Sequence, residues 1–334
     1  MISIRQLEVG YKKGRHTAPI MRFPDISIGK GSFIAIAGPN GIGKSTLIKT
    51  LVQLIPPLEG EIHIKGKSIS TYSRVELASL ISYVSTEIIQ ATQVTVRDIV
   101  TFGRYPYTNW LGKITADDRK ITDQAIELLE LNHLADKFID EISDGERQRA
   151  MIARAIAQQT DIIILDEPTA FLDLPHKHEI IHLLGKFSRE YGKTILFTTH
   201  DLGIALREAD KLWLLSENGF YEGAPEDLVL NGAISKVFNT PNVMFDSRKG
   251  EFLVKRVFRP YFHLIGKTSA VYWTRIALEK DGFTILDCEN EHAPKILIDH
   301  HPSGYQWMID SGDKRDTFAS VSKLREFIRS NFSA

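Results

Sequence analysis

The sequence predicts a two-domain α/β protein. A glycine-rich loop lies between an apolar, strand-like run and a helix-like stretch, and two further apolar runs end in carboxylates or in a histidine. A pattern of alternating strands and helices resumes beyond residue 260. Because 334 residues exceed the usual size of one hydrophobic core, we expect one large domain followed by a smaller one.

The composition excludes several classes of protein. Hydrophobic residues make up 43% of the chain and charged residues 25%, as in ordinary soluble proteins. A net charge of −1 offers no basic excess to neutralise a phosphate backbone, so no nucleic-acid partner is expected. No apolar run approaches the ~20 residues of a membrane span, and the start of the chain does not resemble a signal peptide. The lone Cys288 predicts no internal disulfide, which fits a reducing cytoplasm.

The first 37 residues predict a small antiparallel sheet. Residues 2–37 alternate like short strands that break at Gly10, Gly14 and residues 29–31, and residues 61–66 read as an edge strand. Tyr11 falls in this sheet. Its ring could stack on an adenine face or could be an ordinary half-exposed sheet residue, and the position alone leaves both interpretations open.

A phosphate-binding loop is the strongest local signal. It follows the apolar run Phe33-Ile34-Ala35-Ile36-Ala37 and reads Gly38-Pro39-Asn40-Gly41-Ile42-Gly43-Lys44-Ser45-Thr46. Backbone N–H groups of such a loop surround phosphates, and the following helix directs its positive end at the same anion. The pattern places Lys44 on the β and γ phosphates and the Ser45 hydroxyl on Mg²⁺.

A helical segment interrupts the strands. Apolar spacing is mostly helical between Thr95 and Gln159, which predicts a helical subdomain over about residues 88–158. Its last helix begins with Ser143 as N-cap and Glu146 three residues later, the spacing of a capping box. That helix start could bind an anion or could be an ordinary capped helix.

Two apolar runs predict buried parallel strands. Residues 162–165 precede Asp166 and Glu167, and residues 194–199 precede His200. Carboxylates at the C-terminal end of such a strand, beside a phosphate loop, are placed to hold Mg²⁺ and to orient water. His200 at the same sheet edge favours a γ-phosphate contact over a purely structural role, and Asp173 adds a further acid.

The chain resembles the ATP-binding subunit of an ABC transporter in the order and spacing of four motifs. These are the phosphate loop, Ser-x-Gly-Glu-Arg-Gln, Asp-Glu and the strand-end histidine. The resemblance covers roughly residues 1–240. It implies an ATP-binding domain over residues 1–254, with a RecA-like core, an antiparallel β subdomain and the helical subdomain. ATP and Mg²⁺ are the implied cofactors.

The resemblance also implies the roles of individual residues. Tyr11 matches the adenine-stacking aromatic, Asp166 the Mg²⁺ ligand, Glu167 the general base and His200 the γ-phosphate contact. In this family the serine–glycine motif completes the site of the opposite protomer. Ser143, Gly145 and Glu146 would therefore meet ATP across a head-to-tail homodimer, and Asp173 would link its two sites.

Two motifs depart from the family pattern. The usual glutamine after the strand ending at Val84 is replaced by Ser85-Thr86-Glu87, so either Glu87 substitutes at the Mg²⁺ site or the site signals less tightly to its permease. Asp144 stands where glycine is common and Glu146 where glutamine is common. An acid near the triphosphate costs affinity unless it points away or pairs with Arg147.

A short stretch indicates the transporter class. Thr95–Val100 followed by Gly103-Arg104-Tyr105-Pro106 is similar to subunits that drive uptake of ferric siderophores, haem and cobalamin, although such a turn could merely end a helix. The implied protein is the motor of an importer at the cytoplasmic face of the bacterial inner membrane. Its partners would be a membrane permease and, indirectly, a substrate-binding protein. The alternative is a soluble ABC-type ATPase of ribosome, DNA or cluster assembly.

Residues 255–334 predict a separate small α/β accessory domain. Helical spacing covers residues 270–280 and 320–329, and strand-like runs lie at Ile265 and at residues 283–286, 295–299 and 305–309. Gly266-Lys267-Thr268 lacks the earlier glycine of a phosphate loop and reads as a strand end and N-cap, while His300-His301 reads as a solvated turn before Pro302. We expect a regulatory or dimer-stabilising role.

Overall fold

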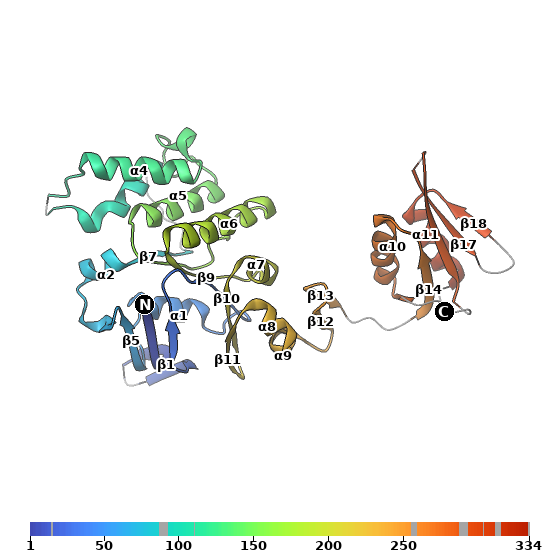
Figure 1. The fold of residues 1–334 in the computed structure, drawn as a ribbon, viewed down its shortest axis with the longest axis horizontal. Coiled ribbons are helices and arrows are strands. Elements are labelled where there is room, and N and C mark those ends of the chain that lie inside the picture. Colours follow the sequence, from blue (N-terminus) through green and yellow to red (C-terminus); the bar gives the residue numbers. More distant parts are fainter. Residues whose placement is uncertain are drawn as a thin grey trace. The chain divides into compact units, whose positions relative to one another are not determined.

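A computed structural model of the chain divides into two compact units. It describes residues 1–14, 16–86, 93–109, 111–254, 259–286, 293–302, 304–310 and 315–332. The first unit comprises residues 1–240 and 244–253, and the second comprises residues 241–243 and 254–334. Figure 1 shows the mixed α/β character of both units. No helix among the described residues is long and apolar enough to cross a bilayer.

An antiparallel sheet opens the first unit. Its strands run in the order β2-β1-β5-β6, and β3 pairs with β1. The bounds are β1 Ile2–Lys13, β2 His16–Phe23, β3 Ile26–Ile28, β5 Glu59–Ile64 and β6 Lys67–Ser68. The predicted break at Gly10 is wrong, because β1 continues through it with a bulge between Val9 and Gly10. The two-residue β6 pairs with β5, so β5 is not the edge strand that was predicted.

A six-stranded sheet forms the centre of the first unit, in the order β11-β10-β4-β9-β8-β7. Pairing is parallel from β10 to β7, and only β11 runs antiparallel. Every residue of β4, β8 and β9 is buried, which confirms the strands predicted from apolar runs. The bounds are β4 Phe33–Ala37, β7 Ile81–Val84, β8 Ile162–Leu165, β9 Thr194–Thr198, β10 Lys211–Ser216 and β11 Gly219–Gly223.

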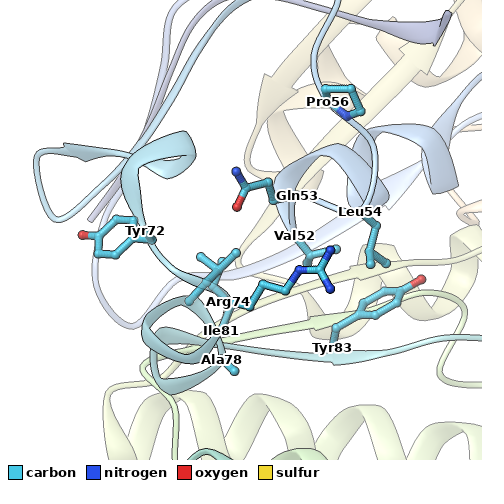
Figure 2. A pocket seen from close by; sticks show the side chains of 10 residues that line it. Val52, Gln53, Leu54, Pro56, Tyr72, Arg74, Ala78, Ile81 and Tyr83 are labelled. Atoms are coloured by element: carbon cyan, nitrogen blue, oxygen red, sulfur yellow. The ribbon is translucent and has the colours of Figure 1, made fainter.

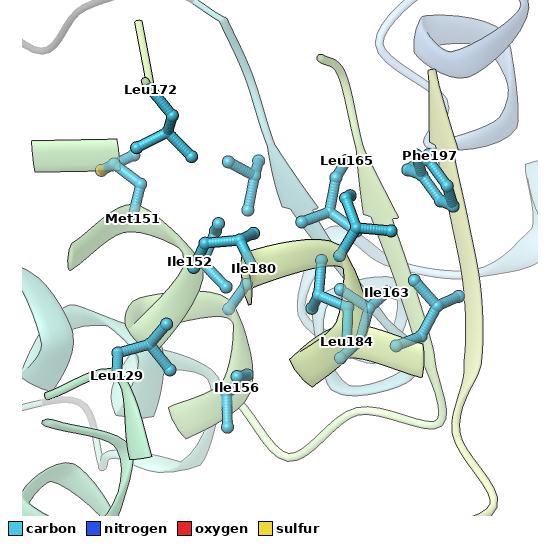
Figure 3. Packing of buried hydrophobic residues seen from close by; sticks show 14 of the residues in the cluster. Leu129, Met151, Ile152, Ile156, Ile163, Leu165, Leu172, Ile180, Leu184 and Phe197 are labelled. Atoms are coloured by element: carbon cyan, nitrogen blue, oxygen red, sulfur yellow. The ribbon is translucent and has the colours of Figure 1, made fainter. Parts of the chain in front are cut away.

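Side-chain alternation sends neighbouring residues of this sheet into two different cores. Ile163, Leu165 and Phe197 pack with helical residues such as Ile152 and Leu184, as Figure 3 shows. The intervening residues of β4, β8 and β9 pack instead against helix α1 (Lys44–Leu51) and the antiparallel sheet. The period of two therefore decides which strand residues face α1.

The predicted helical subdomain is present. It consists of α3 Val96–Thr101, η2 Phe102–Tyr107, α4 Ala116–Leu128, η3 Asn132–Leu134 and α5 Asp144–Ala157. Capping boxes begin α3, α4 and α5, and the last of these confirms the predicted Ser143–Glu146 pair. Arg104 lies 6% exposed and donates to the Asp118 carboxylate at 2.8 Å and to the Ala157 carbonyl at 2.8 Å, which fastens η2 to α4 and α5.

The remaining helices of the first unit contact the sheets. They are η1 Ile69–Thr71, α2 Arg74–Leu80, α6 Leu174–Tyr191, α7 Leu202–Glu208, α8 Pro225–Leu230 and α9 Ala233–Phe238. A hairpin of β12 Val243–Asp246 and β13 Glu251–Val254 follows them. Phe252 of the hairpin packs edge-on against Phe238 and Phe245. These aromatic contacts join β13 to α9.

The second unit has its own hydrophobic core. Its five-stranded sheet has the order β15-β14-β16-β17-β18, and the two helices contribute Leu278, Leu324 and Ile328 to the core. The bounds are β14 Arg259–Ile265, α10 Ser269–Lys280, β15 Phe283–Leu286, β16 Lys295–His301, β17 Gly304–Asp310, β18 Arg315–Phe318 and α11 Val321–Phe332. The strand end and N-cap predicted at residues 266–268 are confirmed, since β14 ends at Ile265 and Thr268 is the N-cap of α10. The turn predicted at His300-His301 is wrong, because both histidines extend β16.

An ion-pair cluster joins the two helices of the second unit. The Asp281 side chain, 4% exposed, follows α10 and accepts hydrogen bonds from Arg325 and Arg329 of α11. These hydrogen bonds, Arg325's foremost, hold the pKa of Asp281 at about 2, below its usual 3.8. Because the folded pKa is depressed, the stabilisation is complete above about pH 4 and is lost as the pH falls through 2.

We therefore predict that Asp281→Asn destabilises the second unit by about 1.5–3 kcal/mol at neutral pH, the usual contribution of hydrogen bonds to a charged group. Urea unfolding followed by tryptophan fluorescence measures the change. The difference from the parent should shrink toward pH 2. Asp299→Asn, at an exposed position of β16, is the matched control and should change little. An equal loss in both variants would contradict the role of the cluster.

Candidate functional site

The phosphate loop lies between β4 and α1, as predicted. Gly43 is the N-cap of α1 with φ 109°, and no described side chain caps this helix. A Cβ at Gly43 would lie 2.6 Å from Ile20 Cγ2, and one at Gly38 would lie 2.5 Å from the Leu215 carbonyl oxygen. Only glycine fits both positions. The open amide groups at the start of α1 can therefore face an anion.

Lys44 is held inside this loop. Its side chain is 5% exposed, and its ammonium group donates to the carbonyl oxygens of Gly38 at 2.9 Å and Pro39 at 3.1 Å. Burial lowers the pKa of Lys44, and the nearby charges of Glu167 and Asp166 oppose that shift. A desolvated cation held near the amide groups of the loop is suited to bind phosphate.

Three strand ends meet beside the loop because β4, β9 and β8 are parallel neighbours. Asp166, directly after β8, is 2% exposed, and its Oδ1 accepts a hydrogen bond from the Ser45 hydroxyl at 3.1 Å. Glu167 adopts a left-handed backbone with φ 49°, and its carboxylate contacts Nε2 of His200. The edge thus brings Lys44, Ser45, Asp166, Glu167 and His200 into one site.

Tyr11 stands beside the start of α1. Its ring is 50% exposed, and its hydroxyl lies 3.3 Å from Oγ1 of Thr46. A half-exposed aromatic ring next to the phosphate loop presents a face on which a planar base can stack.

The predicted motif at the start of α5 forms a separate cluster. The Ser143 hydroxyl and the Glu146 carboxylate cap one another's backbone amides. The pKa of Glu146 is lowered because its carboxylate accepts hydrogen bonds from the Ser143 amide, foremost, and from the Ser143 hydroxyl. Asp144 pairs with Arg147 at 2.7 Å, which neutralises the acid that departs from the family pattern. A Cβ at Gly145 would lie 3.1 Å from a methyl group of Leu172. The hydrogen bonds of Ser143 and Glu146 stay within this helix start.

Of the two remaining predicted site acids, Asp173 and Glu87, the structure describes only Asp173. Asp173 is the N-cap of α6, where its carboxylate accepts from the His176 amide at 3.1 Å and contacts the His176 ring. This backbone hydrogen bond is the main cause of its lowered pKa. Glu87, the candidate substitute for the usual glutamine, lies outside the described residues.

The sequence interpretation missed Thr198. Its hydroxyl is fully buried, donates to Asp166 Oδ1 at 2.7 Å and accepts from the Glu167 amide at 2.8 Å. The signal was available, because Thr198 is the last residue of β9, and the run of parallel strands places its side chain on the side of α1.

Comparison with known proteins agrees with this geometry. Residues 23–170 match the ABC transporter family, and residues 259–329 match the iron ABC transporter C-terminal domain. The chain is 36% identical to the achromobactin transport ATP-binding protein CbrD of Dickeya dadantii, over 71% of this chain and 87% of that protein. This chain belongs to the ATP-binding proteins of ABC transporters.

Other members and solved structures support the assignment. Identity is 36% to the ferric enterobactin transport ATP-binding protein FepC of Escherichia coli, over 72% of this chain and 88% of that one. A protein described as a metal-chelate type ABC transporter superposes with a TM-score of 0.62 at 29% identity, covering 75% and 94% of the two chains. A bacterial ABC transporter cassette, solved as a dimer, superposes with a TM-score of 0.60 at 28% identity. The superposition covers 67% of this chain and 99% of that one. The ABC ATP-binding protein is thus an ATPase with the predicted fold.

We predict that Lys44→Ala weakens ATP binding by about ten- to a hundredfold, since a charged hydrogen bond contributes about 1.5–3 kcal/mol. Titration with a fluorescent ATP analogue measures the affinity. Lys211→Ala is the control and should bind ATP normally, because it removes an exposed lysine of β10 that pairs with Glu222 of β11. Unchanged binding by Lys44→Ala would contradict the phosphate-loop assignment.

Proposed function

We propose that this ABC ATPase drives an importer of a metal chelate, which is a ferric siderophore, haem or cobalamin. The observation that carries the proposal is the combination of the assembled nucleotide site with a C-terminal unit that matches the iron ABC transporter C-terminal domain. Relatives named for achromobactin and ferric enterobactin transport support the same cargo class. The subunit would act at the cytoplasmic face of the bacterial inner membrane, with a permease and a substrate-binding protein as further components.

The donor set at the sheet edge fits Mg²⁺. The Ser45 hydroxyl and the Asp166 carboxylate are hard oxygen ligands that already contact one another at 3.1 Å beside the phosphate loop. Mg²⁺ would neutralise charge on the bound phosphates. Ser45 and Asp166 would hold it, and Glu87 is a further candidate ligand.

Glu167 and His200 supply the groups for hydrolysis. The Glu167 side chain is 29% exposed, so water can reach its carboxylate, and its contact with His200 restrains its position. Glu167 would accept the proton of the attacking water, while Lys44 and His200 would contact the γ-phosphate. Tyr11 would stack on the adenine.

The start of α5 is suited to complete the site of a second copy. The capping box satisfies the amides of Ser143 and Glu146 and leaves those of Asp144 and Gly145 outside it. Amides at the first turn of a helix attract an anion, and the Asp144–Arg147 pair limits repulsion. Two ATP molecules would then lie between two head-to-tail chains, with the exposed Asp173 at the junction.

A surface groove is the proposed docking site of the permease. It has a volume of about 720 Å³ and is lined by the segment that follows α1 and by residues of α2 and β7, including Leu54, Arg74 and Ile81. Figure 2 shows these side chains around the opening. Helix α2 contacts η2, where Phe102 and Tyr105 are 50% and 66% exposed. The buried Arg104 holds η2 in shape, so the exposed aromatic rings are the groups offered to a partner.

We predict that Glu167→Gln keeps ATP affinity, lowers the turnover number at least about a hundredfold and traps a dimer, because the amide cannot accept the proton. Phosphate release and size-exclusion chromatography with ATP measure these effects. Glu226→Gln, in the first turn of α8, is the matched control and should behave like the parent. Parental turnover by Glu167→Gln would exclude it as the base.

The same variant tests the importer assignment. Pull-down of Glu167→Gln with ATP from detergent-solubilised native membranes, followed by mass spectrometry, should recover a many-spanning permease in stoichiometric yield. Recovery of only ribosomal, DNA-binding or cluster-assembly proteins would favour a soluble ATPase and overturn the importer proposal.

The second unit is proposed to regulate or stabilise the dimer. Its core contains no residue of the nucleotide site, so deletion of residues 259–334 should leave ATP affinity within about twofold of the parent. Analytical ultracentrifugation with ATP should show weaker dimerisation, or the ATPase rate should lose a regulatory response. A truncated chain that folds but no longer binds ATP would contradict the separation of the two units.

A further inference from the structure

One buried hydroxyl joins the two carboxylate residues of the nucleotide site. Thr198 Oγ1 donates to Asp166 Oδ1 at 2.7 Å and accepts from the Glu167 amide at 2.8 Å. A hydroxyl has one hydrogen to donate, and Thr198 donates it to Asp166. Thr198 is fully buried, so water cannot take over either hydrogen bond.

The placement of Thr198 follows from the sheet. Leu165 is in register with Phe197 in the parallel pair of β8 and β9, so the next residues, Asp166 and Thr198, are neighbours. Leu196 and Ile164 pack in the core that contains α1, and a period of two puts Thr198 and Asp166 on that same side. The Thr198 side chain thus lies on the α1 side of the sheet, next to Asp166.

The Glu167 backbone needs such an anchor. Its φ of 49° is an uncommon conformation for a residue with a side chain and costs energy unless its surroundings fix it. The hydrogen bond from its amide to Thr198 is one such restraint, and a second acts on Asp166, whose amide donates to the Val84 carbonyl at 2.8 Å.

We propose that Thr198 is a positioning residue for ATP hydrolysis, whose hydroxyl sets the Asp166 carboxylate and the Glu167 backbone at the same time. The inference rests on the proposed roles of Asp166 and Glu167. Thr198 touches neither nucleotide nor water in this role and acts only through the two acids.

Thr198→Val tests the proposal, because valine keeps the shape and removes the hydroxyl. We expect its turnover number to fall at least about tenfold, since a small displacement of a catalytic group costs that much or more. The affinity for ATP in EDTA should stay within about twofold of the parent, and the gain in affinity on adding Mg²⁺ should shrink. Thr198→Ser restores the hydroxyl and should recover turnover to within about threefold.

Thr194→Val is the matched control. Thr194 lies fully buried at the other end of β9, and its hydroxyl bonds to the Gly29 carbonyl and the Gly31 amide at 3.2 Å each. We expect this variant to lose thermal stability much as Thr198→Val does while keeping parental turnover.

Three outcomes would overturn the proposal. The first is parental turnover by Thr198→Val, and the second is an equal loss of turnover in Thr198→Val and Thr194→Val. The third is a Thr198→Ser variant that folds but whose turnover falls by the amount expected for Thr198→Val. The serine variant decides the matter even if valine prevents folding. A failure of Glu167→Gln to slow hydrolysis would instead remove the assigned base, so the two ideas fail separately.

Discussion

The parallel pairing of β4, β9 and β8 is the constraint on which the nucleotide site depends. Parallel neighbours end at the same edge, so the loop after β4, the histidine after β9 and the acids after β8 meet although they are far apart in sequence. The three strands are buried throughout, which fixes their register. A shift by one residue would turn Asp166 and Thr198 away from α1.

Charge at this edge is balanced for an anionic ligand. Asp166 and Glu167 bring two acids close to Lys44. Burial lowers the pKa of Lys44, and the negative charges of the two acids oppose this shift. The open start of α1 adds positive potential without another charged side chain. Hydrogen bonds from Ser45 and Thr198 to one oxygen of Asp166 hold the acid in place before any ligand arrives. Such preorganisation is what catalysis by charge stabilisation requires.

The motif at the start of α5 satisfies its polar groups within one chain. Its polar groups are satisfied locally by the capping box, and the pairing of Asp144 with Arg147 removes a charge that would oppose phosphate. The motif therefore needs no partner in order to fold. Arg104 belongs to the stretch that indicated the transporter class, yet its side chain is buried and fastens η2 to α4 and α5.

The sequence by itself determined the phosphate loop, the capping of α5, the buried strands and the αβ pattern of the C-terminal unit. These depend on short-range hydrogen bonds and on periodicity, which adjacent residues specify. Only the tertiary structure decided that β1 passes through Gly10, that β16 includes both histidines, and that Thr198 joins Asp166 and Glu167. The hydrogen bonds of Asp166 span 32 residues to Thr198 and 121 to Ser45, so they depend on strand order and register rather than on local sequence.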